Sequence, residues 1–179
     1  MKLRDIAHIS IFAALIAVCT WIAIPAPIPF TMQTFAVFAS LGMLGGKRGT
    51  VAVLMYLFLG AVGLPVFSGF RGGIGAIMGP TGGYMAGFVA ICLIYWAAEH
   101  FWGNGTAVMA VSFIIGLALL YGFGSIWFMR VYAQSGESIG FWAVVSQCVL
   151  PFVLPDIAKL SLALIVTRRV RGALGQRVY

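Results

Sequence analysis

The chain has 179 residues, of which 62% are hydrophobic and 8% are charged, and its mean hydropathy is +1.06. Soluble domains carry about 25% charged residues, so this composition excludes an ordinary soluble domain and indicates an integral membrane protein. The net charge of +7 does not indicate a nucleic-acid-binding surface, because the cations flank apolar runs instead of forming one basic face. The alternation typical of barrel strands is absent, so we expect helices.

The apolar runs predict an all-α integral membrane protein, a bundle of six transmembrane helices forming one domain over residues 1–179. A helix needs about 20 apolar residues to cross the hydrocarbon. We interpret the first run as a retained helix rather than a cleaved signal peptide, because nothing soluble follows it. The first five predicted spans cover 6–24, 34 to the GGKRG segment at 45–49, 50–63, 82–98 and 106–129.

Two of the connecting segments are unusual. In "IPAPIPFTMQ" (24–33) three alternate prolines cannot continue a helix and favour an extended path. "LPVFSGFRGGIGAIMGPTGG" (64–83) is the longest irregular segment, and its glycines let the backbone approach a ligand closely. A polar linker over 130–138 follows the fifth span.

The end of the chain allows two interpretations. Residues 139–166 form one long span that contains prolines, or 140–150 form a short interfacial helix and a new helix begins at Pro155. We favour the second, with a span from Pro155 to Arg171, because proline suits the first turn of a helix. Asp156 would then face the positive end of the helix dipole.

Six spans place both termini on one side of the membrane. With that side in the cytoplasm, only Arg71 and Arg130 lie outside, which agrees with the preference of cations for cytoplasmic loops. The proline-rich loop, the glycine-rich loop and Asp156 then converge at the outer face, where we expect a ligand pocket. The cations expected inside are Lys2, Arg4, Lys47, Arg48, Arg168, Arg169, Arg171 and Arg177.

Asp156 and Lys159 in "LPDIAK" stand three residues apart on one helix face. Ionisable residues within a membrane span are functional candidates, although a self-neutralising pair near the interface, with the lysine reaching towards water, is the alternative. Together the two side chains offer an acceptor and a donor, which suits a ligand with adjacent N–H and C=O groups such as a cyclic urea.

Arg71 is the only charged residue of the glycine-rich loop, and its planar guanidinium suits a carboxylate; an exposed interfacial arginine is the alternative. Thr81 and nearby backbone N–H groups are expected at the start of the fourth helix, a natural polar-ligand site. Polar and aromatic residues near these loops predict either a pocket wall or an interfacial belt: Phe30, Gln33, Phe67, Phe70 and Tyr84.

The sequence offers little for catalysis, metal binding or nucleotide binding. Ser68 is a nucleophile by type only, since neither histidine is expected on its side of the membrane. The cysteines lack metal or redox spacing, and "GMLGGKR" departs from a P-loop, so work driven by ATP requires a partner. Ala13 and Ala17 form a small-xxx-small face that packs either within this chain or against another one.

The segments "PIPFTMQTF", "GLPVFSGFRGGIGAIMGPTGGYMAGF" and "LPFVLPDIAKLSLA" resemble the BioY family, the biotin-specific substrate-binding subunits of energy-coupling factor transporters, over essentially the whole chain. The resemblance implies a biotin pocket, no cofactor, and docking to a transmembrane scaffold protein and two ATPase subunits. Ala13 and Ala17 match the face that meets the scaffold. The positions that match the family's pocket are Gln33, Arg71, Gly73, Thr81, Gly83, Tyr84, Asp156 and Lys159.

The expected function is therefore biotin capture at the outer face of the cytoplasmic membrane and delivery across it, without catalysis by this chain. Biotin carries a ureido ring with two N–H donors and one carbonyl, and a valerate carboxylate. We expect Asp156 to accept a ureido N–H, Lys159 to donate to the ureido oxygen, and Arg71 or loop N–H groups to bind the carboxylate. The alternatives are a binding subunit for another vitamin, a small intramembrane enzyme, and a secondary carrier.

Overall fold

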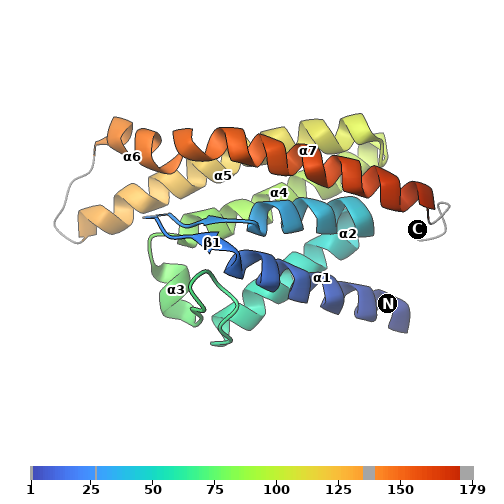
Figure 1. Ribbon diagram of the computed structural model, residues 1–179, viewed down its shortest axis with the longest axis horizontal. Coiled ribbons are helices and arrows are strands. Elements are labelled where there is room, and N and C mark those ends of the chain that lie inside the picture. The colour runs from blue at the N-terminus through green and yellow to red at the C-terminus, as the bar shows by residue number, and fades with distance from the viewer. Residues whose placement is uncertain (1, 27, 135–139, 174–179) are drawn as a thin grey trace.

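The computed structural model describes residues 2–26, 28–134 and 140–173, and most of them are helical (Figure 1). A two-stranded antiparallel hairpin pairs Ala23 with Thr31 and Ile24 with Phe30, so Ile24, Phe30 and Thr31 of the proline-rich segment are extended as predicted. The elements are α1 (Leu3–Trp21), β1 (Ala23–Ile24), β2 (Phe30–Thr31), α2 (Gln33–Ala61), α3 (Ile74–Met78), α4 (Gly82–Trp102), α5 (Thr106–Gln134), α6 (Phe141–Cys148) and α7 (Leu150–Ala173).

The helix α2 is broken at Gly45 into two halves, residues 33–44 and 46–61, which correspond to the second and third predicted spans. Gly45 has φ 80° and ψ 166°, a backbone conformation that residues with a side chain rarely adopt. The N–H of Gly46, at the start of the second half, donates to Oε2 of Glu99 at 2.6 Å. The chain therefore turns back on itself here, and α2 supplies two of the six helices of the bundle.

The six long helical segments run along one axis, and the chain enters and leaves at the same end. Figure 1 shows the start of α1 and the end of α7 together at the right, with the hairpin and α3 at the left. The helices α1, α4, α5 and the α6–α7 segment are each long and apolar enough to cross a membrane. The predicted all-α membrane bundle is confirmed.

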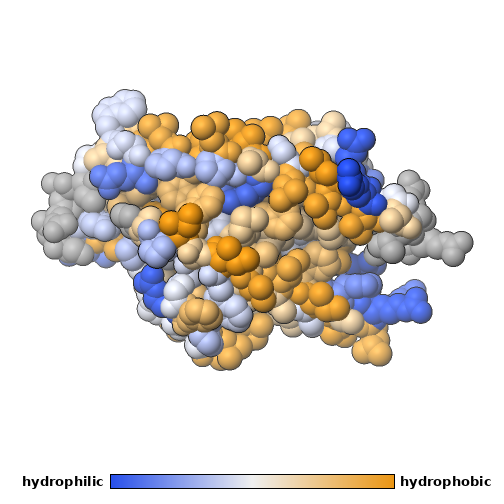
Figure 2. All heavy atoms as spheres, in the orientation of Figure 1, coloured by the Kyte–Doolittle hydropathy of each residue, from blue (hydrophilic) through white to orange (hydrophobic). Residues whose placement is uncertain are grey.

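The outside of the bundle is apolar, as a surface that faces lipid requires. Figure 2 shows apolar side chains along most of this face, with strongly hydrophilic residues mostly towards its two ends. Phe58, Ile126 and Leu154 are 65%, 69% and 78% exposed. The interior is packed by aromatic side chains, and the rings of Phe38 and Phe113 stack with centroids 4.6 Å apart.

Two predicted boundaries are wrong. The helix α7 begins at Leu150 and passes through Pro155 instead of starting there. Pro155 has no N–H for the carbonyl of Pro151, which lies in the first turn of the helix and is exposed. The helix α5 extends to Gln134, so Arg130 is helical rather than part of a linker; the rest of that linker, 135–138, lies outside the described residues.

Candidate functional site

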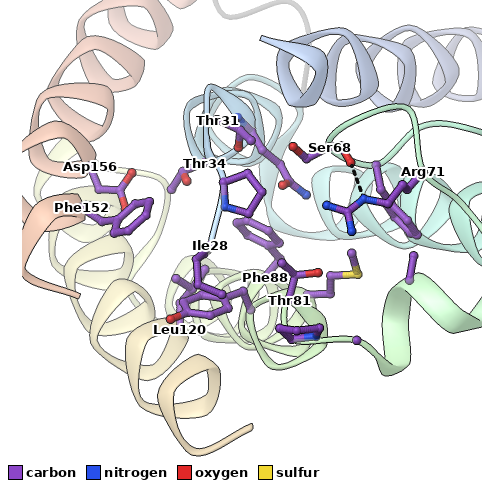
Figure 3. A pocket seen from close by; sticks show the side chains of 18 of the residues that line it. Ile28, Thr31, Thr34, Ser68, Arg71, Thr81, Phe88, Leu120, Phe152 and Asp156 are labelled. Carbon is purple, nitrogen blue, oxygen red and sulfur yellow. Dashed lines mark hydrogen bonds between the residues drawn. The ribbon is translucent and has the colours of Figure 1, made fainter. Parts of the chain in front are cut away.

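A cavity of about 280 Å³ lies at the end of the bundle that holds the hairpin and α3. Its wall combines β2 and the starts of α2 and α4 with the glycine-rich loop, α5 and the first turns of α7 (Figure 3). The volume is close to the lower end of ligand pockets, about 300 Å³, so the cavity suits a small molecule. Six of the eight predicted site residues line it: Gln33, Arg71, Thr81, Tyr84, Asp156 and Lys159.

Asp156 and Lys159 form a buried ion pair at one side of this cavity. Nζ of Lys159 donates to Oδ1 of Asp156 at 2.9 Å, and the two residues are 5% and 3% exposed. Two charges held out of water are tolerated only where further hydrogen bonds satisfy them. Because α7 starts at Leu150, Asp156 lies in its second turn, beyond the reach of the helix dipole that was expected to stabilise it.

Side chains and backbone from distant segments stabilise the pair instead. The hydroxyl of Tyr121, on α5, donates to Oδ2 of Asp156 at 2.7 Å. Nζ of Lys159 also donates to the carbonyl of Thr31 in β2 at 2.6 Å and stands 3.9 Å from the ring centroid of Phe30. Each oxygen of Asp156 thus keeps one lone pair for a ligand, and the ammonium keeps one N–H.

Arg71 lies across the cavity from Asp156 (Figure 3). Its Nε donates to the carbonyl of Ser68 at 3.3 Å, and a bridge in which the N–H of Phe67 donates to the Arg71 carbonyl closes the turn. Within the described chain no group accepts a hydrogen bond from the terminal nitrogens of this guanidinium. The cavity therefore has an ion pair at one side and, at the other, a cation with no counter-ion among the described residues.

Gln33, Tyr84 and Thr81 line the space between these groups. Nε2 of Gln33 donates to the hydroxyl of Tyr56 at 3.1 Å. The hydroxyl of Tyr84 donates to the carbonyl of Cys148 at 3.2 Å. Thr81 is the N-cap residue of α4, as predicted, although its side chain makes no capping hydrogen bond.

Gly73 and Gly83 are not part of the cavity wall. Gly73 is the N-cap of α3 with φ 88°, and its N–H donates to the carbonyl of Gly60 at 2.7 Å, which ties the glycine-rich loop to α2. A β-carbon on Gly83 would lie 2.3 Å from Cβ of Trp127, so glycine here lets α4 pack directly on α5. Both glycines shape the site without facing it.

Ala13 and Ala17, the positions predicted to dock a partner, are buried inside this chain. They are 3% and 6% exposed and belong to the main hydrophobic core. The small-xxx-small face of α1 therefore packs within the bundle, where α1 lies against α2. The lipid-facing side of α1 carries larger residues instead, among them Ile11 and Val18.

The structure adds residues that the sequence did not indicate. Tyr121, Tyr56 and the carbonyl of Thr31 contact predicted site residues, but Thr31 and Lys159 are 128 positions apart in the chain. The only feature of the sequence that could have indicated Tyr56 and Tyr121 is that each places a hydroxyl within an apolar run. Ser68 lines the cavity too. His8 lies near the start of α1 and His100 near the end of α4, both at the end of the bundle away from the cavity, so Ser68 has no histidine to act as its base.

A six-helix membrane bundle with a cavity at one end, lined by both polar and apolar side chains, defines a membrane protein that binds a small ligand. The chain belongs to the BioY family, whose model matches residues 1–176. A biotin transporter BioY of Thermotoga maritima is 39% identical over 177 residues, covering 94% of this chain and 96% of that protein.

Further matches agree with this assignment. A probable biotin transporter BioY of Pyrococcus horikoshii is 36% identical over 173 residues, covering 96% of this chain and 99% of that protein. The crystal structure of the S-component for biotin from an ECF-type ABC transporter superposes with a TM-score of 0.81 at 26% identity, covering 96% of this chain and 92% of that one. The likeness therefore extends over the whole bundle.

Proposed function

We propose that this chain is the substrate-binding subunit of a biotin transporter and that biotin occupies the described cavity. The observation that carries the proposal is the buried Asp156–Lys159 pair, which keeps free acceptor and donor positions beside the cavity. This pair occurs in a chain whose relatives are named biotin transporters. Biotin is a ligand here rather than a cofactor, and the proposal includes no catalysis.

The ureido ring fits the ion pair. Asp156 accepts one ureido N–H, and Lys159 donates to the ureido oxygen, as an ionised acceptor beside a cationic donor can. The apolar rings of biotin lie against the cavity's apolar wall, which includes Phe88 and Leu120. Arg71 lies across the cavity and binds the valerate carboxylate, since its terminal nitrogens have no acceptor among the described residues.

Transport requires partners, because the sequence has no P-loop to bind ATP. The chain, as a single six-helix domain, docks on a transmembrane scaffold protein and two cytoplasmic ATPase subunits. The cavity opens towards the outer face of the cytoplasmic membrane, and both termini are cytoplasmic. The cations Lys47 and Arg48, beside the break in α2, support this orientation. Since Ala13 and Ala17 are buried, docking on α1 uses its exposed side.

Binding of tritiated biotin by the purified chain tests the proposal. Biotin should bind with saturation and be displaced by unlabelled biotin but not by other vitamins. Displacement by another vitamin, or copurification of a different ligand identified by mass spectrometry, would assign the cavity to that compound. Uptake by liposomes containing only this chain, without ATPase subunits, would instead identify a secondary carrier.

A further inference from the structure

Tyr56 lies on the second half of α2, lines the cavity and is 1% exposed. Its hydroxyl contacts three polar groups. These are Nε2 of Gln33 at 3.1 Å, Oγ1 of Thr20 at 3.2 Å and the carbonyl of Val66 at 3.4 Å. One buried hydroxyl therefore joins α1, both halves of α2 and the loop that leads to Arg71.

The protons of this cluster can be assigned by counting donors. The hydroxyl of Thr20 has one proton, which it donates to the carbonyl of Ile16 at 2.7 Å, so its oxygen can only accept from Tyr56. The single proton of Tyr56 goes to Thr20 or to Val66, and in either case it is not available to Gln33. The amide of Gln33 must therefore donate to Tyr56.

This assignment determines which end of the Gln33 amide the ligand meets. If the amide were flipped, Tyr56 would have to donate to Gln33, and its single proton would no longer be available to Thr20 or Val66. With the nitrogen directed at Tyr56, the side-chain oxygen is turned away from it. In the described part of the chain nothing donates to that oxygen, and Gln33 lines the cavity.

We propose that Tyr56, held by Thr20, is a positioning residue that turns the side-chain carbonyl of Gln33 towards the ligand, where it accepts an N–H. The inference rests on the proposed function and adds a second acceptor to the same site. Gln33 is next to the ion pair, because the N–H of Gln33 donates to Oγ1 of Thr31, while Lys159 donates to the carbonyl of Thr31. A cyclic urea has two N–H groups, of which Asp156 accepts only one.

A double-mutant cycle between Tyr56→Phe and Gln33→Ala tests this role, with biotin affinity measured by calorimetry on each folded variant. Tyr56→Phe should weaken binding about 3- to 10-fold, the scale of one neutral hydrogen bond, when Gln33 is present. It should weaken binding less than about twofold in the Gln33→Ala background. The same substitution in an Arg71→Ala background is the control and should keep its full effect.

An equal loss with and without Gln33 would mean that Tyr56 acts only through packing, and no loss at all would also overturn the proposal. Two cyclic carbamate analogues of biotin, each with oxygen in place of one ureido N–H, provide a test that does not depend on Tyr56→Phe folding. Gln33→Ala should reduce the ratio of the affinity for biotin to the affinity for one of these analogues. An unchanged preference over both would refute the carbonyl contact.

The wild-type titration separates the two proposals. If the wild-type chain does not bind biotin, the proposed function fails. If it binds biotin but the cycle shows no coupling between Tyr56 and Gln33, only the positioning role fails.

Discussion

Replacing Asp156 with asparagine removes the negative charge from the ion pair while keeping the size of the side chain. The amide oxygen must face Lys159, since an amide nitrogen there would place donors against donors. The nitrogen then replaces Oδ2, which accepts from Tyr121 at 2.7 Å. A ligand N–H that approached this side would meet a donor instead of an acceptor.

The magnitude follows from one lost hydrogen bond to a charged acceptor, about 1.5–3 kcal/mol. Biotin affinity should therefore fall about 10- to 150-fold. Lys159, which is 5% exposed, also loses its counterion. Leaving a buried charge unpaired typically costs about 3–5 kcal/mol of folding stability, so the thermal unfolding midpoint should fall as well.

Isothermal titration of biotin into the purified protein measures the affinity, and size-exclusion chromatography establishes that the variant is folded. Asp5→Asn is the matched control, because Asp5 also forms an ion pair, with Nε of Arg48 at 3.2 Å, but at the start of α1. This pair is only partly buried and does not line the cavity, so this control should bind biotin within about twofold of wild type. A folded Asp156→Asn variant with wild-type affinity, or an equal loss in Asp5→Asn, would refute the reasoning.

Arg71→Ala should lower biotin affinity about tenfold, from one lost charge-assisted hydrogen bond, and leave binding of biotin methyl ester unchanged; an equal loss for both ligands would place the carboxylate elsewhere. Gly83→Val should lower the thermal unfolding midpoint, because its β-carbon would lie 2.3 Å from Cβ of Trp127 and overpacking costs about 1–3 kcal/mol. Glu99→Gln weakens the hydrogen bond to the N–H of Gly46 at 2.6 Å, so scanning calorimetry should show a lower midpoint with unchanged biotin affinity; a weaker affinity would link the break in α2 to the cavity.

Much of the fold could be predicted because hydropathy is a local property. Apolar runs located the six helices, and the paired glycines before Lys47 marked where α2 turns back. The start of α7 was misplaced because the prediction used only local sequence. A proline is favoured at the first turn of a helix, but whether the helix extends beyond it depends on what surrounds that turn.

The candidate site was partly predictable, because charged residues in an apolar chain are few and conspicuous. Asp156, Lys159 and Arg71 could be selected from sequence, and the structure brings all three to one cavity. Gly73 and Gly83 matched the family pattern equally well, yet neither of them lines the cavity. A match to a motif does not distinguish a residue that contacts the ligand from one that only packs near the site.

By its sequence alone, this protein is a six-helix membrane bundle with its few outer polar residues gathered at one end, because membrane insertion depends on the composition of each segment. Only the tertiary structure decided which groups complete the site and which side of α1 is hidden. Tyr121 reaches Asp156 across 35 residues of chain, and Ala13 is buried in the bundle, where α1 packs against α2. Hydrogen bonds act over about 3 Å in space, and spacing along the chain does not encode such distances between helices.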